Sequence, residues 1–339
     1  MGASIEAMDL RGVSLAGMDL RLTRWVSVSL AGANLRGALL GGAAFSGVDF
    51  EGADLRGADL AGAELSAASL SGADLTEASL LEANLTDADL RGCVVDRTRF
   101  EQTALGGANL SSLDLTGCRV ITDKMTGALL TGARFFLADF SGADLRGSAV
   151  DARTELVKCL CWGVTATGLG LAGVRLDDSD FTGAKLDGAD LQGASARQTC
   201  FAKASLSRAK MVGIEGLRAN FSAASLEGAD LSRASLEDAE LSGARADTSL
   251  FRGARLDHAR FVKASLRSAA FDGSSLLWAD LSHADLTAAS LRDARLDHAN
   301  LHRAILRDAD TDGAAMTQAR STDPKRAAAE DFSTKAVRA

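Results

Sequence analysis

The chain has 339 residues, of which 34 are Gly, one is Pro and none is Tyr, and aromatic residues make up only 5%. Hydrophobic residues reach 47% and charged residues 24%, which excludes a disordered chain, because such chains are poor in apolar residues. The formal net charge is −8 and no basic patch is present, so nucleic-acid binding is not predicted.

The first predicted element is a five-residue repeat over residues 3–150. Every fifth residue from Ile5 to Val150 is apolar, and 24 of these 30 positions are Leu or Phe. Ala stands two residues earlier in 17 of the 30 units, as in Ala53-Asp54-Leu55. Residues two apart on an extended chain point to one side, so the small and the large residue face inward and the residue between them faces outward. The other two residues suit a corner, and the chain is predicted to wind into a solenoid.

Residues 151–170 are predicted to form an irregular coil with a phase shift of one residue. We call the large inward residue of each unit its centre. Val150 and Leu171 are both centres, but the step between them is one residue more than a multiple of five. When the second phase is extended backwards, Cys159 and Cys161 fall on inward positions. One continuous helix with a single-residue bulge within 151–155 is the preferred interpretation, and two blocks that meet at a kink are the alternative. Upstream, Asp123 falls on an inward position, which predicts a local distortion or an internal partner.

The repeat resumes over residues 171–318. Of its 30 centres 24 are Leu or Phe, and Ala precedes 23 of them by two residues. Gly216 occupies a centre and leaves a hole that Leu217 is predicted to cover. Residues 321–339 leave the repeat, and Thr322 or Asp323 is predicted to cap a helix with Pro324 in its first turn. Residues 325–332 are expected to form a short lid over the last coil.

These Ala-(Asp/Asn)-Leu-x-x units resemble pentapeptide-repeat proteins over roughly residues 3–318. The resemblance implies an all-β fold, a right-handed quadrilateral parallel β-helix with one pentapeptide on each side. With four units per coil, about 16 coils would give a rod of roughly 75 Å with a short C-terminal helical tail. The near absence of Pro agrees, because stacked coils use almost every backbone N–H in the ladder.

Two outward apolar patches are candidate partner contacts. Positions 20 apart stack on adjacent coils, so His258, Trp278 and His298 are predicted to share one outward column, with Leu277 beside it. The two imidazoles would lie about 10 Å apart, too far for one metal ion with ligand bonds of ~2 Å, and no metal or cofactor is predicted. A covering C-terminal lid or neighbouring corner is the alternative.

The second patch lies near the phase shift. Phe136 and Leu137 follow a centre, and Val157 is predicted to stack over Phe136. The alternative to a partner surface is that the bulge folds over these side chains.

Residues 49–90 carry ten acids and one base, Arg56, for a net charge of −9. Some pentapeptide-repeat proteins mimic DNA and bind DNA gyrase or topoisomerase IV, so the resemblance makes these acids a candidate DNA-mimic surface. The acids are expected on all four sides, without a lengthwise stripe, which counts against mimicry. They are Asp49, Glu51, Asp54, Asp59, Glu64, Asp74, Glu77, Glu82, Asp87 and Asp89.

The predicted function is a non-catalytic bacterial scaffold for protein–protein interaction, similar to accessory proteins of secretion or effector systems. The alternative is the DNA mimic that inhibits a topoisomerase or protects it from poisons. An enzyme needs convergent polar groups in a cleft, which a filled rod does not offer. Five cysteines without framework spacing, and no signal peptide or membrane span, predict a cytoplasmic protein, with signal-independent secretion left open. Some relatives dimerise through C-terminal elements, so the resemblance also allows a homodimer through an end of the rod.

Overall fold

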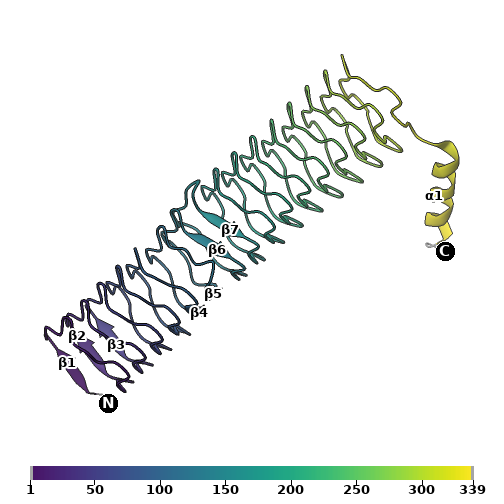
Figure 1. Cartoon of the computed structure of the whole chain (residues 1–339). Coiled ribbons are helices and arrows are strands. Elements are labelled where there is room, and N and C mark those ends of the chain that lie inside the picture. The colour runs from purple at the N-terminus through teal and green to yellow at the C-terminus, as the bar shows by residue number, and fades with distance from the viewer. Residues whose placement is uncertain (1–2, 337–339) are drawn as a thin grey trace. The chain divides into compact units, whose positions relative to one another are not determined.

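The structure is a computed structural model that describes the backbone of residues 3–336 and the side chains as far as Asp331. The chain divides into two compact units, Met1–Asp180 and Phe181–Ala339. Figure 1 labels the strands and the helix that these units carry. The first unit carries the strands β1 (Ser4–Glu6), β2 (Arg24–Val26), β3 (Ala44–Ser46), β4 (Arg99–Glu101), β5 (Arg119–Ile121), β6 (Arg134–Phe136) and β7 (Glu155–Val157), and the second carries the helix α1 (Pro324–Ala336).

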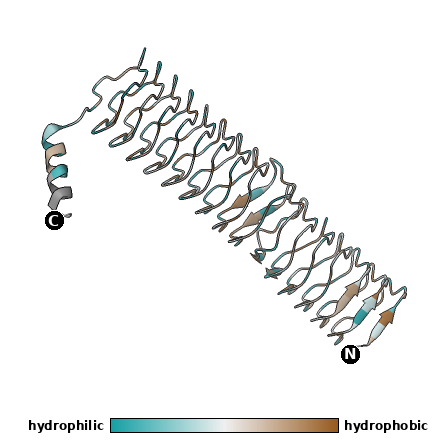
Figure 2. Ribbon diagram, turned by 180° about the vertical axis from the view of Figure 1, so that it is seen from behind, coloured by the Kyte–Doolittle hydropathy of each residue, from teal (hydrophilic) through white to brown (hydrophobic). Residues whose placement is uncertain are grey.

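Each unit is a four-sided parallel β-solenoid. Strands β1, β2 and β3 pair in parallel with Ile5, Trp25 and Phe45 in register. Elsewhere single-residue bridges join positions 20 apart, such as Ser205 with Ser225. Four of the five-residue units therefore complete a coil, as predicted. Figure 2 shows hydrophilic and hydrophobic positions interleaved along the coils.

The number of coils is best given for each unit by itself. The bridges advance by the same step along most of the chain, so residues 3–180 make about nine coils and residues 181–320 about seven. The prediction of about 16 coils took the repeat as one continuous helix, whereas the structure divides the chain into two compact units of about nine and about seven coils.

The preference for Asp or Asn before each centre has a local cause. Side-chain oxygens of Asp74 and Asn84 accept the backbone N–H two residues on, from Thr76 at 3.0 Å and Thr86 at 3.1 Å. These Asx-type contacts fix the corner. The second corner residue has a positive φ, 62° at Gly52, where glycine avoids the Cβ clash. The corner backbone therefore favours Asp or Asn at the position before each centre, and Gly at the second corner position.

The predicted inward residues form the core. Leu and Phe centres are almost completely buried together with the Ala two residues before them. Because each coil repeats the one below it, large rings meet across coils: Phe201 stacks on Phe181 and Phe221 with centroids 5.5 and 5.1 Å apart. One large and one small side chain per unit therefore fill the narrow interior.

The predicted distortion at Asp123 is confirmed. Strand β5 pairs in regular register with β4 on the preceding coil. On the following coil its last residue, Ile121, bridges Asp139, whereas the regular step of 20 residues would pair it with Ser141. Thr122 takes the buried position, and its hydroxyl donates to the carbonyl of Thr103 at 2.7 Å. Asp123 is exposed. The shortened register thus keeps an unpaired carboxylate out of the core, where burial would be costly.

An extra residue enters the solenoid at 151–154. Strands β6 and β7 pair across a coil that is one residue longer than the regular 20. Phe135 therefore lies opposite Leu156 and not opposite residue 155. At this corner the backbone N–H of Gly132 donates to Asp151 Oδ1 at 3.0 Å and to Thr154 Oγ1 at 3.2 Å. Two side-chain oxygens therefore replace the backbone acceptor that the inserted residue displaces.

The hole at Gly216 is filled differently from the prediction. A Cβ at this position would stand 2.8 Å from Leu236 Cδ2, so Leu236 of the next coil occupies the space. Leu217 is 41% exposed and lines a surface groove of about 520 Å³ together with Arg197 and Arg255. The assignment of Leu217 was wrong because the position after a centre faces outward.

Helix α1 begins as predicted, with Asp323 as the cap and Pro324 in the first turn. Oδ1 of Asp323 accepts the backbone N–H groups of Lys325 at 2.9 Å and Arg326 at 3.2 Å. The helix does not cover the last coil as a lid, because its described contacts fall on the side of the coils while Leu306 and Met316 stay only half-buried. The side chain of Phe332 and residues 337–339 lie outside the described part of the chain.

Candidate interaction surfaces

The column predicted around Trp278 is present in the second unit. The Trp278 ring lies parallel to the rings of His258 and His298, with centroids 6.5 and 4.0 Å apart. Trp278 is 48% exposed. All three residues are at corners with φ of 61–62°, a left-handed region that costs roughly 1–2 kcal/mol for a residue with a Cβ. We call His258, Leu277, Trp278 and His298 the Trp278 surface.

The Trp278 surface has a polar border whose carboxylates are held by the solenoid. Asp257 Oδ1 accepts the backbone N–H of Leu277 at 3.0 Å and the hydroxyl of Ser275 at 2.5 Å. On the other side, Asp297 Oδ1 accepts the backbone N–H of Thr317 at 3.1 Å. Leu277 therefore lies half-buried between two fixed acidic residues, beside the exposed indole.

The second patch forms where β6 and β7 pair. Val157 stands opposite Phe136 as predicted, and it is buried while Phe136 is half-buried. Lys158 Nζ lies 5.5 Å from the centre of the Phe136 ring, a cation–π distance. Leu137 is 67% exposed. The coil after the bulge thus covers part of this patch and leaves Leu137 in solvent.

The ten acids of residues 49–90 do not form a lengthwise stripe. Glu77, Glu82 and Asp87 lie on corners with φ of 56–59°. Four of the ten acids are paired with arginines of the same unit: Asp54 and Asp74 with Arg56, Glu77 with Arg97, and Asp89 with Arg91. Bound arginine charge therefore offsets part of the negative charge of this segment.

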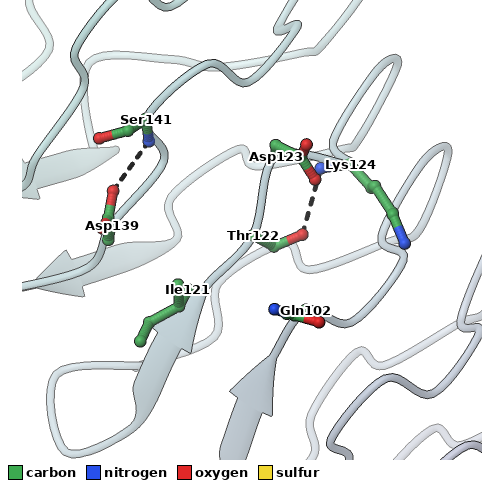
Figure 3. A pocket seen from close by; sticks show the side chains of 7 residues that line it. All are labelled: Gln102, Ile121, Thr122, Asp123, Lys124, Asp139 and Ser141. Atoms are coloured by element: carbon green, nitrogen blue, oxygen red, sulfur yellow. Dashed lines mark hydrogen bonds between the residues drawn. The ribbon is translucent and has the colours of Figure 1, made fainter.

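The distortion at 121–124 opens a surface pocket of about 400 Å³ (Figure 3). Asp139 Oδ1 accepts the backbone N–H of Ser141 at 2.9 Å, and Thr122 Oγ1 accepts that of Lys124 at 3.1 Å. These hydrogen bonds join near neighbours along the chain and hold the corners. They do not join groups that converge across the pocket. The residues that line it are Gln102, Ile121, Thr122, Asp123, Lys124, Asp139 and Ser141.

The inward cysteines are unreactive core residues in this structure. Cys159 and Cys161 are buried, as predicted. Burial raises the pKa of the Cys159 thiol to about 12, and it raises the pKa values of Cys93 and Cys118 to about 12 as well. A protonated thiol is a poor nucleophile and a poor metal ligand.

A cluster of two histidines and a carboxylate beside helix α1 was not predicted from the sequence. His283 Nε2 and His302 Nε2 lie 3.5 and 3.4 Å from the same carboxylate oxygen, Glu330 Oε2. The two histidines are one position short of a full coil apart, which places them diagonally on successive coils, whereas the prediction compared only positions 20 apart. Glu330 comes from the helix, whose docking position no repeat pattern specifies.

A family model for pentapeptide repeats matches eight copies in the chain, over residues 9–46, 43–81, 83–120, 124–148, 171–213, 218–253, 249–287 and 284–320. The chain belongs to the pentapeptide-repeat family. The resemblance read from the Ala-Asp-Leu units is thereby confirmed.

Solved structures of the same repeat architecture are similar to parts or most of the chain. Full-length QnrB1, a plasmid-mediated fluoroquinolone resistance protein, is 21% identical over 67% of this chain and 96% of its own, with a TM-score of 0.29. Rfr23 from the cyanobacterium Cyanothece 51142 is 32% identical over 30% and 63%, with a TM-score of 0.19. HetL from Nostoc sp. strain PCC 7120, involved in heterocyst differentiation regulation, is 26% identical over 93% and 92%, with a TM-score of 0.15. The family assignment rests on the repeat match and not on these scores.

A comparison with curated proteins finds no match. Within the described residues, no helix has both the length and the apolar character that crossing a bilayer requires.

Proposed function

We propose that this protein is a non-catalytic scaffold that binds a protein partner through the Trp278 surface. The observation that carries the proposal is a half-exposed indole, held between two imidazoles on a corner that favours glycine. Many corners of the repeat share this left-handed φ, so the exposure of the indole is what distinguishes Trp278. Trp is enriched among the residues that dominate the binding energy of protein interfaces.

Burial of Trp278 by a partner would contribute as much binding free energy as a typical anchor residue of a protein interface. A Trp side chain buries 150–250 Å² in an interface, so a partner that covers the exposed half of Trp278 removes roughly 100 Å² from water. At about 25 cal/mol per Å² this burial contributes about 2.5 kcal/mol. The parallel imidazoles already restrain the ring, which lowers the ordering cost of binding.

The surface fits a partner that presents an apolar side chain to Trp278 and Leu277. Asp257 and Asp297 on either side favour hydrogen-bond donors or basic residues around that side chain. Their positions are fixed by the backbone contacts of Leu277 and Thr317. A small apolar centre with a polar border is the usual arrangement of a protein interface.

A topoisomerase-binding DNA mimic is the alternative function, and the acidic segment 49–90 favours it. Its net charge of −9 falls within little more than two coils, and DNA carries one charge per ~1.7 Å of duplex. The ion pairs of Arg56, Arg91 and Arg97 and the spread of acids over all sides weigh against it.

The test uses the tagged full chain as bait in a bacterial lysate, followed by direct binding of each captured protein to the purified chain. Trp278→Ala is expected to weaken binding by roughly 30-fold or more, since 1.4 kcal/mol corresponds to tenfold. The matched control is Trp162→Ala, which removes the exposed indole of the first unit. Retention of full affinity in Trp278→Ala would exclude this surface as the contact.

A parallel bait separates the alternative. In it the ten acids of 49–90 are changed to Asn or Gln. Capture of gyrase or topoisomerase IV that is lost with this bait but kept by Trp278→Ala would establish the mimic and replace the scaffold proposal.

Trp278→Gly serves as the folding control for the Trp278 variant. Relief of left-handed strain offsets the lost ring stacking and the higher entropy of unfolded Gly, so its stability should match that of the wild type within about 1 kcal/mol.

A further inference from the structure

The cluster beside helix α1 brings two imidazoles and a carboxylate together. One ligand atom from each of His283, His302 and Glu330 lies within 4.8 Å of the other two. The side chain of His302 is 3% exposed, and those of His283 and Glu330 are 27% and 32% exposed. The group is therefore anchored in the solenoid on one side and open to solvent on the other.

The spacing of the three groups is compatible with metal ligation. His302 Nε2 and Glu330 Oε2 form a long hydrogen bond at 3.4 Å, and His283 Nε2 lies 3.5 Å from the same oxygen, both beyond the usual 2.7–3.2 Å of an N–H···O bond. Zinc bonds to His nitrogen and carboxylate oxygen measure about 2.0–2.2 Å, so ligand atoms on a tetrahedron are about 3.3–3.5 Å apart. The rings of His283 and His302 lie edge to face, with centroids 5.6 Å apart and planes at 77°.

We propose that His283, His302 and Glu330 form a divalent transition-metal site of the Zn²⁺ class that fastens helix α1 to the side of the last coils. Two imidazoles with one carboxylate are a recurrent zinc ligand set, with the fourth position held by water. Imidazole nitrogen disfavours Mg²⁺ and Ca²⁺, which prefer oxygen ligands. The open side of the cluster gives the ion and its water a way in.

Two hydrogen bonds of His302 have to change when the ion binds: the bond between Nε2 and Glu330 Oε2, at 3.4 Å, and the bond from the Asp323 amide. His302 Nδ1 accepts the backbone N–H of Asp323 at 3.1 Å, so the neutral ring carries its proton on Nε2. A metal on Nε2 moves this proton to Nδ1, which can then no longer accept the N–H of Asp323. The Asp323 amide is therefore a reporter of binding at His302.

The arginines around Glu330 leave room for the ion. Arg303 Nε is 3.2 Å from Glu330 Oε2 but lacks hydrogen-bond alignment. The same guanidinium donates through its terminal nitrogen to the carbonyl of Ala327 at 2.6 Å and to Asp331 at 2.7 Å, so it stays bound if Glu330 turns to a metal. Arg326 Nε is 3.0 Å from the other oxygen, Oε1. The carboxylate can thus keep Arg326 on one oxygen and offer the other to the ion.

The first measurement is a calorimetric titration of the full chain with ZnCl₂, with Co²⁺ absorption as a report of coordination geometry. We expect one ion per chain in a tetrahedral environment. His283→Asn and Glu330→Gln change half-exposed side chains, and each should weaken binding at least about 100-fold, since loss of an outer-shell partner alone costs 10–100-fold. The matched control is the double variant His258→Asn/His298→Asn, which removes the other two of the four histidines and should bind as the wild type does.

A structural readout accompanies the titration. Zn²⁺ should slow hydrogen exchange of the amides of residues 327–330 and displace the amide resonance of Asp323, and neither change should occur in His283→Asn. Thermal unfolding of each metal-free variant establishes that it is folded. Absence of saturable Zn²⁺ binding by the wild type, wild-type affinity in both ligand variants, or loss of binding in the His258/His298 control would each overturn the site.

Discussion

The stacked phenylalanines of the second unit provide a direct test of how the core is stabilised. Phe201 has no exposed surface, and its ring lies between Phe181 and Phe221 at 5.5 and 5.1 Å. Phe201→Ala removes the ring and leaves a cavity, because the neighbouring coils are held by their backbone ladders and can collapse only in part. Phe201→Leu is the matched control, since Leu is the usual residue at the centres.

The magnitude follows from burial and stacking. A buried Phe→Ala change costs about 3–5 kcal/mol, and each of the two aromatic pairs contributes about 0.5–1.5 kcal/mol within that loss. We therefore expect Phe201→Ala to lower the free energy of unfolding by about 4 kcal/mol. Phe201→Leu restores most of the volume but neither aromatic pair, so a loss of about 1–3 kcal/mol is expected from the two missing pairs.

The assay is urea unfolding followed by circular dichroism, with hydrogen exchange of the amides in the coils at 181, 201 and 221. Because each coil contacts only its neighbours, protection should fall most in these three coils. A loss below about 1 kcal/mol for Phe201→Ala, or equal losses for the Ala and Leu variants, would refute the cavity-and-stacking account.

Three further predictions concern positions at which the repeat is interrupted or titratable. Thr154→Val removes one hydroxyl acceptor of the Gly132 N–H, and it should cost about 1–2 kcal/mol in chemical unfolding; a neutral result would show that Asp151 alone suffices. The folded protein keeps the Cys159 proton up to a pKa of about 12 whereas the unfolded thiol releases it near 9, so this thiol alone should lower the unfolding free energy by about 1.4 kcal/mol per pH unit between these values. Cys159→Ala should fall less steeply with pH, and parallel profiles would contradict the assignment. Gly216→Leu restores the repeat consensus but overfills the space held by Leu236, so it should lower the melting temperature through a loss of about 1–3 kcal/mol; a rise would mean that Leu236 can withdraw.

Much of the two candidate surfaces could be predicted from the sequence, because the position of a residue in the repeat determines whether its side chain faces inward or outward. The constant coil period placed Trp278 between His258 and His298, and the phase shift placed Val157 opposite Phe136. It also marked Asp123 as a residue that could not stay inward. Each of these conclusions needs only alternation along an extended segment and stacking at a constant period.

The conclusions that failed depend on contacts the period does not describe. Leu236 fills the space at Gly216 because it is an inward residue of the next coil, whereas Leu217 faces outward. The cluster of His283, His302 and Glu330 exists because α1 folds back along the coils, a position set by Arg303 and Asp323 and not by any repeat.

The sequence by itself determined the five-residue unit, its inward pair, its corners and the family, since each follows from local geometry repeated along the chain. Only the tertiary structure decided which side-chain oxygens satisfy the Gly132 N–H at the inserted residue, which leucine fills the glycine position and where the helix docks. These outcomes are set by distances between segments far apart in sequence, where packing and hydrogen-bond satisfaction select one arrangement among several that the local pattern permits.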